Sequence, residues 1–193
     1  MQRVGACRWQ AGHAEGPLCA LVRSIVFQQL SGKAAETIYG RVRAKFPPGR
    51  FPKPGQIMAL SDEELRSCGL SGQKLSYLRD LCIRVDAGQL DLNRLSALED
   101  AEVIAQLTQV RGVGRWSAQM FLMFYLGRLD VWPDGDLGIR SALRILHGHD
   151  ELPTPKATAA LAERYRPYGS VASWYLWRLL ELPADEHDKL RDG

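Results

Sequence analysis

Apolar residues recur along this chain every three or four positions, the spacing that buries one side of a helix. In segment 101–110 these positions are Val103, Ile104, Leu107 and Val110. The same kind of pattern occurs in segments 18–29, 32–46, 71–85, 115–126, 139–146, 155–165 and 170–180. Ser61 and Glu64 have the spacing of a capping box, which predicts a further helix start. The pattern predicts an all-α fold of about ten helices. A buried strand is the alternative for the most apolar segments.

A glycine-containing hairpin separates the expected helices 101–110 and 115–126. Gly112 and Gly114 allow a tight turn and remove the side chains that would keep a phosphate from the backbone N–H groups. The following helix adds the positive end of its dipole. Such a loop can hold a nucleic-acid backbone without reading its sequence. An ordinary helix–helix turn with a glycine cap is the alternative.

An acidic turn follows the hairpin, and its sequence at 132–138 is Trp-Pro-Asp-Gly-Asp-Leu-Gly. Asp136 stands directly before an apolar helix and 20 positions after Trp116. A carboxylate in this place can act in catalysis, and Asp is also a favoured helix N-cap. Both roles can coexist in one residue. Asp134 is the competing carboxylate of the turn.

Composition limits the class of protein. A chain of 193 residues can form one compact domain or two small lobes around a cleft. No apolar run approaches the roughly 20 residues that span a bilayer, and the N-terminus does not read as a secretion signal. The net charge of +3 is only mildly basic. Affinity for nucleic acid must therefore come from local groups of basic residues.

The cysteines do not indicate a metal or disulfide framework. They are Cys7, Cys19, Cys68 and Cys82, and no two of them form a CxxC unit. We expect reduced thiols in a protein of the cytoplasm, which would be associated with the nucleoid if the protein is bacterial.

The hairpin and the acidic turn together resemble those of the helix–hairpin–helix DNA glycosylases, and within them the 3-methyladenine DNA glycosylase II type. The hairpin positions that match are Leu107, Val110, Gly112, Val113, Gly114, Ser117 and Ala118. The resemblance extends over roughly residues 18–182. It implies two helical lobes with a cleft between them. One is a helical barrel lobe at 31–131 that ends in the hairpin, and the other combines 1–30 with 132–193 and carries the catalytic Asp.

The resemblance assigns catalysis to Asp136, because members of the family place an essential Asp in this turn. Such a carboxylate can stabilise the cationic sugar that forms as the glycosidic bond breaks, and can orient the attacking water. Bifunctional members carry a lysine where this chain has Trp116. Without that amine no Schiff base can form, so the resemblance implies monofunctional chemistry.

A pocket for the extruded base is implied as well, with Trp116, Met120, Tyr168 and Phe27 as its expected residues. An electron-rich Trp face attracts a cationic base. Core packing is the alternative for Trp116. Met120 stands where some relatives place an aromatic residue, which puts the range of accepted bases in question.

The segment Phe27-Gln28-Gln29-Leu30-Ser31 resembles the family's loop that enters DNA where the damaged base leaves. Gln29, Leu30 and Ser31 are the candidates for the wedge that fills the gap. The alternative is that the glutamines only end a helix. The residues expected to contact the DNA backbone are Arg111, Gly112, Val113 and Gly114 of the hairpin, with Gly69 and Lys74 of a second turn.

The expected function is the excision of alkylated purines, such as 3-methyladenine or 7-methylguanine, from double-stranded DNA by a monomer that needs no metal for the chemistry. A monovalent cation at the hairpin could bridge its carbonyl groups to a phosphate. The main alternative is a non-catalytic helix–hairpin–helix DNA-binding module. A third class, an all-α protein-interaction domain, explains neither the glycines nor the acidic turn.

Overall fold

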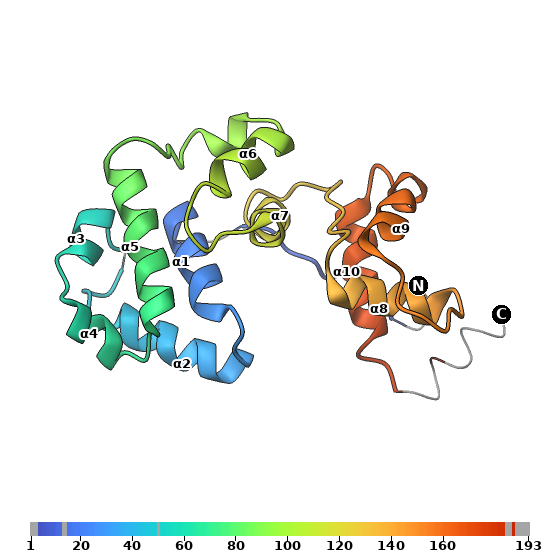
Figure 1. Cartoon of the computed structure of the whole chain (residues 1–193), viewed down its shortest axis with the longest axis horizontal. Coiled ribbons are helices and arrows are strands. Elements are labelled where there is room, and N and C mark those ends of the chain that lie inside the picture. The colour runs from blue at the N-terminus through green and yellow to red at the C-terminus, as the bar shows by residue number, and fades with distance from the viewer. Residues whose placement is uncertain (1–3, 13–14, 50, 184–186, 188–193) are drawn as a thin grey trace. The chain divides into compact units, whose positions relative to one another are not determined.

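A computed structural model describes residues 4–12, 15–49, 51–183 and 187. Within these ranges the chain forms ten α-helices and two 3₁₀-helices, and no strand (Figure 1). The all-α prediction is therefore confirmed. The α-helices are α1 (Pro17–Phe27), α2 (Gly32–Arg43), α3 (Pro54–Met58), α4 (Asp62–Ser67), α5 (Gly72–Asp86), α6 (Asp100–Leu107), α7 (Arg115–Phe124), α8 (Leu137–Leu146), α9 (Pro155–Ala160) and α10 (Gly169–Leu179). The 3₁₀-helices are η1 (Leu95–Ala97) and η2 (Ala162–Arg164).

Two compact units make up the chain. We call residues 12–121 the hairpin unit, and residues 1–11 together with 122–193 the acidic-turn unit. The boundary falls within α7. The sequence assigns residues 1–30 to the second lobe, whereas the contacts group 12–30 with the hairpin unit. The reason is packing, because α1 contacts both α2 and α5 and buries its apolar side there.

Helix α5 is central to the hairpin unit and contacts α1, α3 and α4 (Figure 1). Its core side chains are Leu75, Leu78, Leu81 and Cys82. Each buried leucine of this kind contributes about 1.5–3 kcal/mol to folding. The hairpin rests on the same helix, because Gly112 packs against Tyr77 and the Arg111 amide donates to Asp80. The packed helix therefore supports the hairpin.

Polar side chains fix where α2, α4 and α5 begin in the hairpin unit. Ser61 accepts a hydrogen bond from the Glu64 amide, and the Glu64 carboxylate accepts one from the Ser61 amide. The predicted capping box is therefore confirmed. Ser31 and Ser71 cap α2 and α5 in the same way, each through its hydroxyl. Such a cap stabilises a helix by about 1 kcal/mol.

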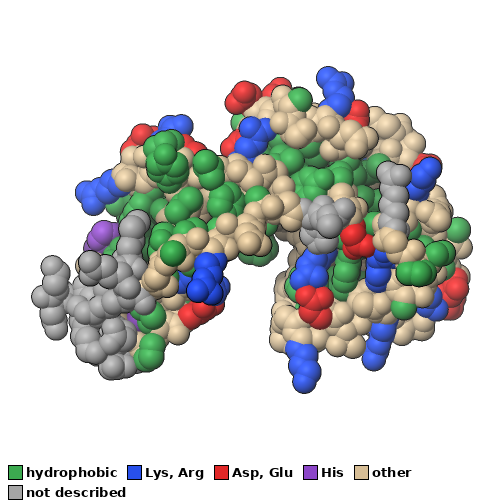
Figure 2. Space-filling view, turned by 180° about the vertical axis from the view of Figure 1, so that it is seen from behind, with side chains coloured by type: hydrophobic (Ala, Val, Ile, Leu, Met, Phe, Trp, Pro, Cys, Tyr) green, Lys and Arg blue, Asp and Glu red, His purple; other side chains and the backbone are tan. Residues whose placement is uncertain are grey.

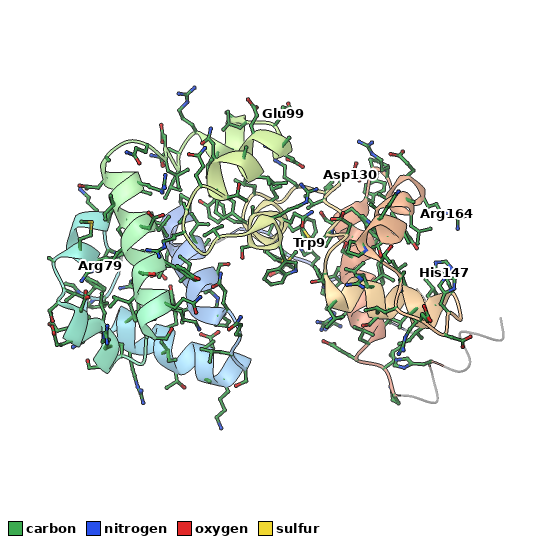
Figure 3. The ribbon with its side chains drawn as sticks, viewed as in Figure 1. Trp9, Arg79, Glu99, Asp130, His147 and Arg164 are labelled. Atoms are coloured by element: carbon green, nitrogen blue, oxygen red, sulfur yellow. The ribbon has the colours of Figure 1, made fainter. Side chains whose placement is uncertain are left out.

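The acidic-turn unit has its own core between α8 and α10, made by Ile139, Ala142, Leu143, Leu176 and Leu179. A loop residue of this unit, Asp130, is labelled in Figure 3 and binds the segment that leads into α10. Its carboxylate accepts hydrogen bonds from the Gly169 amide and from the Arg166 guanidinium. The start of α10 is thereby tied to the segment before the acidic turn.

On the face shown in Figure 2, Lys and Arg side chains stand in small groups interspersed with Asp and Glu. Among the described helices, none has the length and apolar character to cross a membrane.

The cysteines are free thiols. Cys19, Cys68 and Cys82 are buried, and Cys7 is exposed. Burial raises the pKa of Cys82 to about 12, so its thiol stays protonated at neutral pH. No group of three or more His, Cys, Asp or Glu side chains in the described part of the chain is arranged to hold a metal ion.

Candidate functional site

The hairpin between α6 and α7 depends on glycine at one position for two separate reasons. Gly112 has a φ of +78°, in the left-handed region that favours glycine. A β-carbon on Gly112 would overlap the ring of Tyr77. Gly114 differs, because a β-carbon there would meet nothing within 4 Å. The fold therefore requires Gly112, whereas Gly114 leaves open space at the surface of the hairpin.

Three contacts hold the hairpin in place. The Arg111 amide donates to Asp80 Oδ2 at 2.8 Å, and the Val113 amide donates to the Val110 carbonyl at 3.0 Å. Gln28 Nε2 donates to the Gly112 carbonyl at 2.8 Å. The amides of Gly112 and Gly114 donate to no described residue. Two backbone donors are thus available on an anchored loop, which is the arrangement that binds a phosphate.

Asp80 is the ionic part of this anchor. Burial alone would raise the pKa of its carboxyl, but hydrogen bonds from the Arg111 amide and the Arg84 guanidinium outweigh burial and hold the pKa below its usual value. The carboxylate is therefore ionised at neutral pH and stabilises the hairpin.

The turn between α1 and α2 carries the three wedge candidates. Gln29 has a φ of +55°, which is uncommon for a residue with a side chain. Such a conformation costs on the order of 1–3 kcal/mol. Leu30 is 39% exposed, whereas the Ser31 hydroxyl is engaged as the cap of α2. All three residues are exposed, and Ser31 differs from Gln29 and Leu30 because its hydroxyl has a role in the fold as the cap of α2.

One pocket of about 420 Å³ brings three of the sequence-predicted motifs together within the hairpin unit. It joins the turn after α1, the hairpin glycine and the turn before α5. We call it the hairpin pocket, and its lining residues are Gln28, Gln29, Leu30, Ile38, Gly69, Ser71, Gln73, Lys74, Tyr77 and Gly112.

Lys74 and Gly69 have roles in the fold at this pocket. Lys74 Nζ donates to the Val26 carbonyl at 2.6 Å and so ties α5 to the last turn of α1. Burial lowers the pKa of this amine. Gly69 has a φ of +104° and ends α4. The ammonium has three N–H donors, so one bond to Val26 leaves further donors for a ligand.

Two N–H donors from outside the acidic turn fix the side chain of Asp136. Its Oδ1 accepts from the Ile139 amide at 2.8 Å, as an N-cap of α8, and from Trp177 Nε1 at 3.0 Å. Asp136 is only 9% exposed. A β-carbon on Gly138 would lie 2.9 Å from Trp177 Cδ1 and 3.0 Å from Asp136 Oδ1. Glycine at this position therefore allows the indole and the carboxylate to meet.

The expected base-pocket residues are divided between the units. Trp116, Met120 and Phe27 belong to the hairpin unit, whereas Tyr168 belongs to the acidic-turn unit, as Asp136 does. Trp116 is 47% exposed, and its core-packing interpretation is therefore not supported. Tyr168 is 57% exposed and precedes α10. Met120 and Phe27 are half-buried, and the Arg23 guanidinium lies 4.1 Å from the centre of the Phe27 ring.

Sequence reasoning missed two residues of this arrangement. Gln28 holds the hairpin carbonyl, whereas the sequence placed it in the loop that enters DNA or, as the alternative, at a helix end. Trp177 holds Asp136, a contact that the sequence did not predict. A half-buried indole N–H requires an acceptor, and this was the available signal for Trp177. For Gln28 no local signal existed, since its partner is 84 positions away.

Several known proteins are similar to this chain in both sequence and fold. DNA-3-methyladenine glycosylase 1 of Schizosaccharomyces pombe is 35% identical over 167 residues, which are 86% of this chain and 73% of that protein. The solved 3-methyladenine DNA glycosylase Mag1 of that yeast, in complex with abasic DNA, matches with a TM-score of 0.85 at 34% identity over 95% of this chain and 92% of its own. A DNA-3-methyladenine glycosidase structure from Bacillus halodurans matches with a TM-score of 0.83 at 40% identity, over 95% and 86% of the two chains.

The family profile gives the same result over most of the chain. Residues 22–167 match the profile described as HhH-GPD superfamily base excision DNA repair protein, and this range contains the hairpin, the wedge turn and the acidic turn. The chain therefore belongs to the HhH-GPD superfamily of base excision DNA repair proteins.

Proposed function

We propose that this protein is a DNA glycosylase that excises alkylated purines from double-stranded DNA, with 3-methyladenine and 7-methylguanine as representative substrates. The observation that carries the proposal is the Asp136 carboxylate, held at the start of α8 by two N–H donors. The similarity to proteins named 3-methyladenine DNA glycosylases supports the choice of substrate.

The proposed chemistry relies on the charge and the fixed position of Asp136. As the glycosidic bond of an alkylated purine breaks, positive charge develops on the sugar, and a preorganised carboxylate stabilises it without having to reorient. The same group can orient the water that completes hydrolysis. An alkylated purine of this type is itself cationic and departs readily, so the proposal requires no general acid.

The proposal includes monofunctional action of the 3-methyladenine DNA glycosylase II type. An exposed Trp116 stands on α7 at the position where a Schiff-base mechanism would need a lysine. Its indole face can stack on a cationic base. The product would be an abasic site on an intact strand.

DNA would be held by the hairpin amides of Gly112 and Gly114, with Arg111 beside them and the side chain of Val113 buried as an anchor. The hairpin carbonyls have the oxygen chemistry that suits a hard monovalent cation. Of these carbonyls, those of Val110 and Gly112 each accept one hydrogen bond, and a carbonyl oxygen has two lone pairs. Such a cation would neutralise part of the phosphate charge.

A non-catalytic DNA-binding module is the second candidate. The hairpin alone would suit it equally well, whereas the buried and doubly hydrogen-bonded Asp136 and the exposed Trp116 favour an enzyme.

The deciding experiment measures release of free base from methylated duplex DNA. Wild-type protein should release 3-methyladenine and 7-methylguanine and leave the strand intact until alkali is added. Borohydride should trap no covalent protein–DNA adduct. Binding to the duplex without base release would favour the non-catalytic module, and a trapped adduct would contradict monofunctional chemistry.

A further inference from the structure

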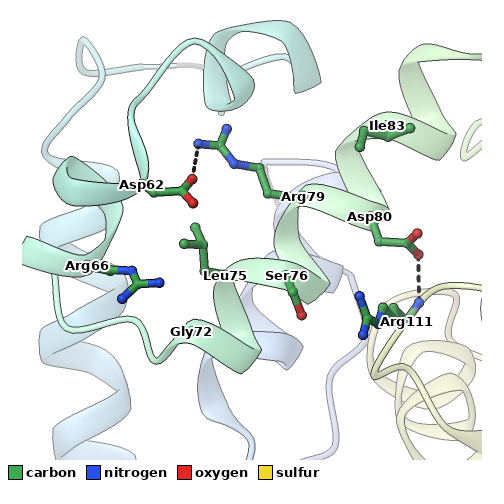
Figure 4. A pocket seen from close by; sticks show the side chains of 9 residues that line it. All are labelled: Asp62, Arg66, Gly72, Leu75, Ser76, Arg79, Asp80, Ile83 and Arg111. Atoms are coloured by element: carbon green, nitrogen blue, oxygen red, sulfur yellow. Dashed lines mark hydrogen bonds and ion pairs between the residues drawn. The ribbon is translucent and has the colours of Figure 1, made fainter.

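A second pocket of about 380 Å³ opens in the hairpin unit beside α5 (Figure 4). Its wall includes Arg66 at the end of α4, Gly72 and Ser76 on α5, and Arg111 of the hairpin. Two residues of the hairpin site line it as well, namely Arg111 and its anchor Asp80. We call it the arginine pocket.

The acidic residues of the arginine pocket are already engaged. Asp62 pairs with Arg79 at 2.9 Å, and Asp80 accepts from the Arg111 amide (Figure 4). Asp80 also accepts from Arg84 Nε. The guanidinium groups of Arg66 and Arg111, by contrast, make no ion pair or hydrogen bond with any described residue. The pocket therefore presents two guanidinium groups without an ion-pair partner, of which Arg111 lies close enough to the Asp80 carboxyl to help lower its pKa.

Arg66 lies between two helix ends, in the last turn of α4 and beside the first residue of α5. A β-carbon on Gly72, the first residue of α5, would lie 3.7 Å from Arg66 Nη2. The N-terminus of this 15-residue helix carries the positive end of its dipole, and its first amides lack intrahelical acceptors. The start of α5 repels a cation beside it, whereas an anion between this helix end and the Arg66 guanidinium would be attracted by both.

The arginine pocket is continuous with the hairpin through one residue. Arg111 contributes its side chain to the pocket, and its backbone leads directly into Gly112. Each strand of duplex DNA has one phosphate per about 3.4 Å of axis. A strand held at the hairpin amides therefore always presents further phosphates to the neighbouring surface.

We propose that the arginine pocket binds a second backbone phosphate of the same DNA, between the guanidinium groups of Arg66 and Arg111 and the start of α5. This inference rests on the proposed function and extends it, because it assigns a DNA contact to α4 and to the side of α5 that carries Ser76. The contact carries no sequence information and serves to position the duplex.

The test is the salt dependence of binding to an undamaged duplex, measured by fluorescence anisotropy between about 50 and about 200 mM salt. Each phosphate contact contributes a slope of about −0.9 to the plot of log K against log salt concentration. Arg66→Gln should make the slope less negative by about 0.9. Arg66→Lys keeps the charge, so its slope should stay close to that of the wild type.

Arg94→Gln is the matched control, because it removes one exposed arginine of the same unit outside both pockets. It should leave the slope at the wild-type value. An unchanged slope for Arg66→Gln, or the same loss for Arg94→Gln, would overturn the proposal. Thermal unfolding should be equal for all variants, since Arg66 makes no side-chain bond that the fold needs.

Failure of the proposed function would look different. In that case the wild-type protein would bind the duplex and release no base. The salt-dependence slopes of wild type and Arg66→Gln would still decide whether the arginine pocket holds a phosphate. A wild type that does not bind the duplex at all would reject both.

Discussion

The hairpin and the acidic turn achieve rigidity by opposite means. The hairpin presents backbone, and it does so by omitting a side chain at Gly112, whose space is filled by Tyr77. The acidic turn presents one side chain, and two N–H donors from Ile139 and Trp177 fix it. Backbone amides suit the phosphate, which is the same at every nucleotide, whereas a single oriented carboxylate suits one step of chemistry. The two regions should therefore fail differently when they are changed.

The largest effect should come from Asp136→Asn. The amide keeps the shape and can still cap α8, but it removes the charge that would stabilise the cationic sugar. Single-turnover excision from methylated DNA should fall by about 10²–10³-fold or more, while binding to undamaged duplex stays near the wild-type value.

Asp134→Asn is the control for that change, since it removes a carboxylate of the same turn, and it should lose less. Near-wild-type excision by Asp136→Asn would remove the acidic turn from the chemistry and leave it as a helix cap.

The next effect separates the two glycines of the hairpin. Gly112→Ala should destabilise the hairpin unit by about 2–4 kcal/mol, because the β-carbon meets Tyr77 at a left-handed φ. Gly114→Val should lower the unfolding free energy by only about 1 kcal/mol, because Val is a poorer N-cap for α7 than Gly, and should weaken binding to damaged and undamaged duplex alike. Denaturant unfolding and binding titrations measure the two effects.

If Gly114→Val affected only damaged DNA, the hairpin would belong to the base pocket and not to the backbone contact. A stable Gly112→Ala variant would show that Tyr77 can move away without loss.

A smaller effect is expected at the wedge turn. Replacing Gln29 and Leu30 together by Gly keeps the Ser31 cap of α2 and removes the side chains that would fill the gap in the base stack. Unstacking costs a few kcal/mol. Excision from a normally paired lesion should therefore fall by about 10-fold, and excision from a mismatched lesion should fall much less. Equal losses on both substrates would indicate a folding defect instead.

The smallest effect concerns the anchor of the hairpin. Asp80→Asn should lower the free energy of unfolding at pH 7 by about 1 kcal/mol, through weaker hydrogen bonds to the Arg111 amide and Arg84. The folded state lowers the pKa of Asp80, so its stabilisation is present above the unfolded value of about 3.9 and is lost as pH falls through the folded pKa.

The difference between wild type and Asp80→Asn should accordingly shrink in unfolding curves recorded below about pH 4. Asp86→Asn removes an exposed carboxylate from the same helix and should change the unfolding free energy by less than about 0.5 kcal/mol. A difference that persists at low pH would mean that Asp80 acts through packing.

Local signals in the sequence were sufficient for much of the fold. Helical spacing predicted the all-α fold, and the Ser61–Glu64 pair predicted the start of α4, because both depend on residues within one or two turns of each other. The hairpin and the acidic turn are equally local, so their place in the chain could be recognised. The family resemblance then assigned roles to their residues.

Tertiary structure decided which of these residues meet. The bond from Gln28 to Gly112 joins positions 84 apart, and the bond from Trp177 to Asp136 joins positions 41 apart. The grouping of α1 with the hairpin unit likewise depends on its packing against α2 and α5. Periodicity indicates which side of a helix is buried but not its partner, since many apolar surfaces could cover it. The partners are fixed only when the whole core packs without voids.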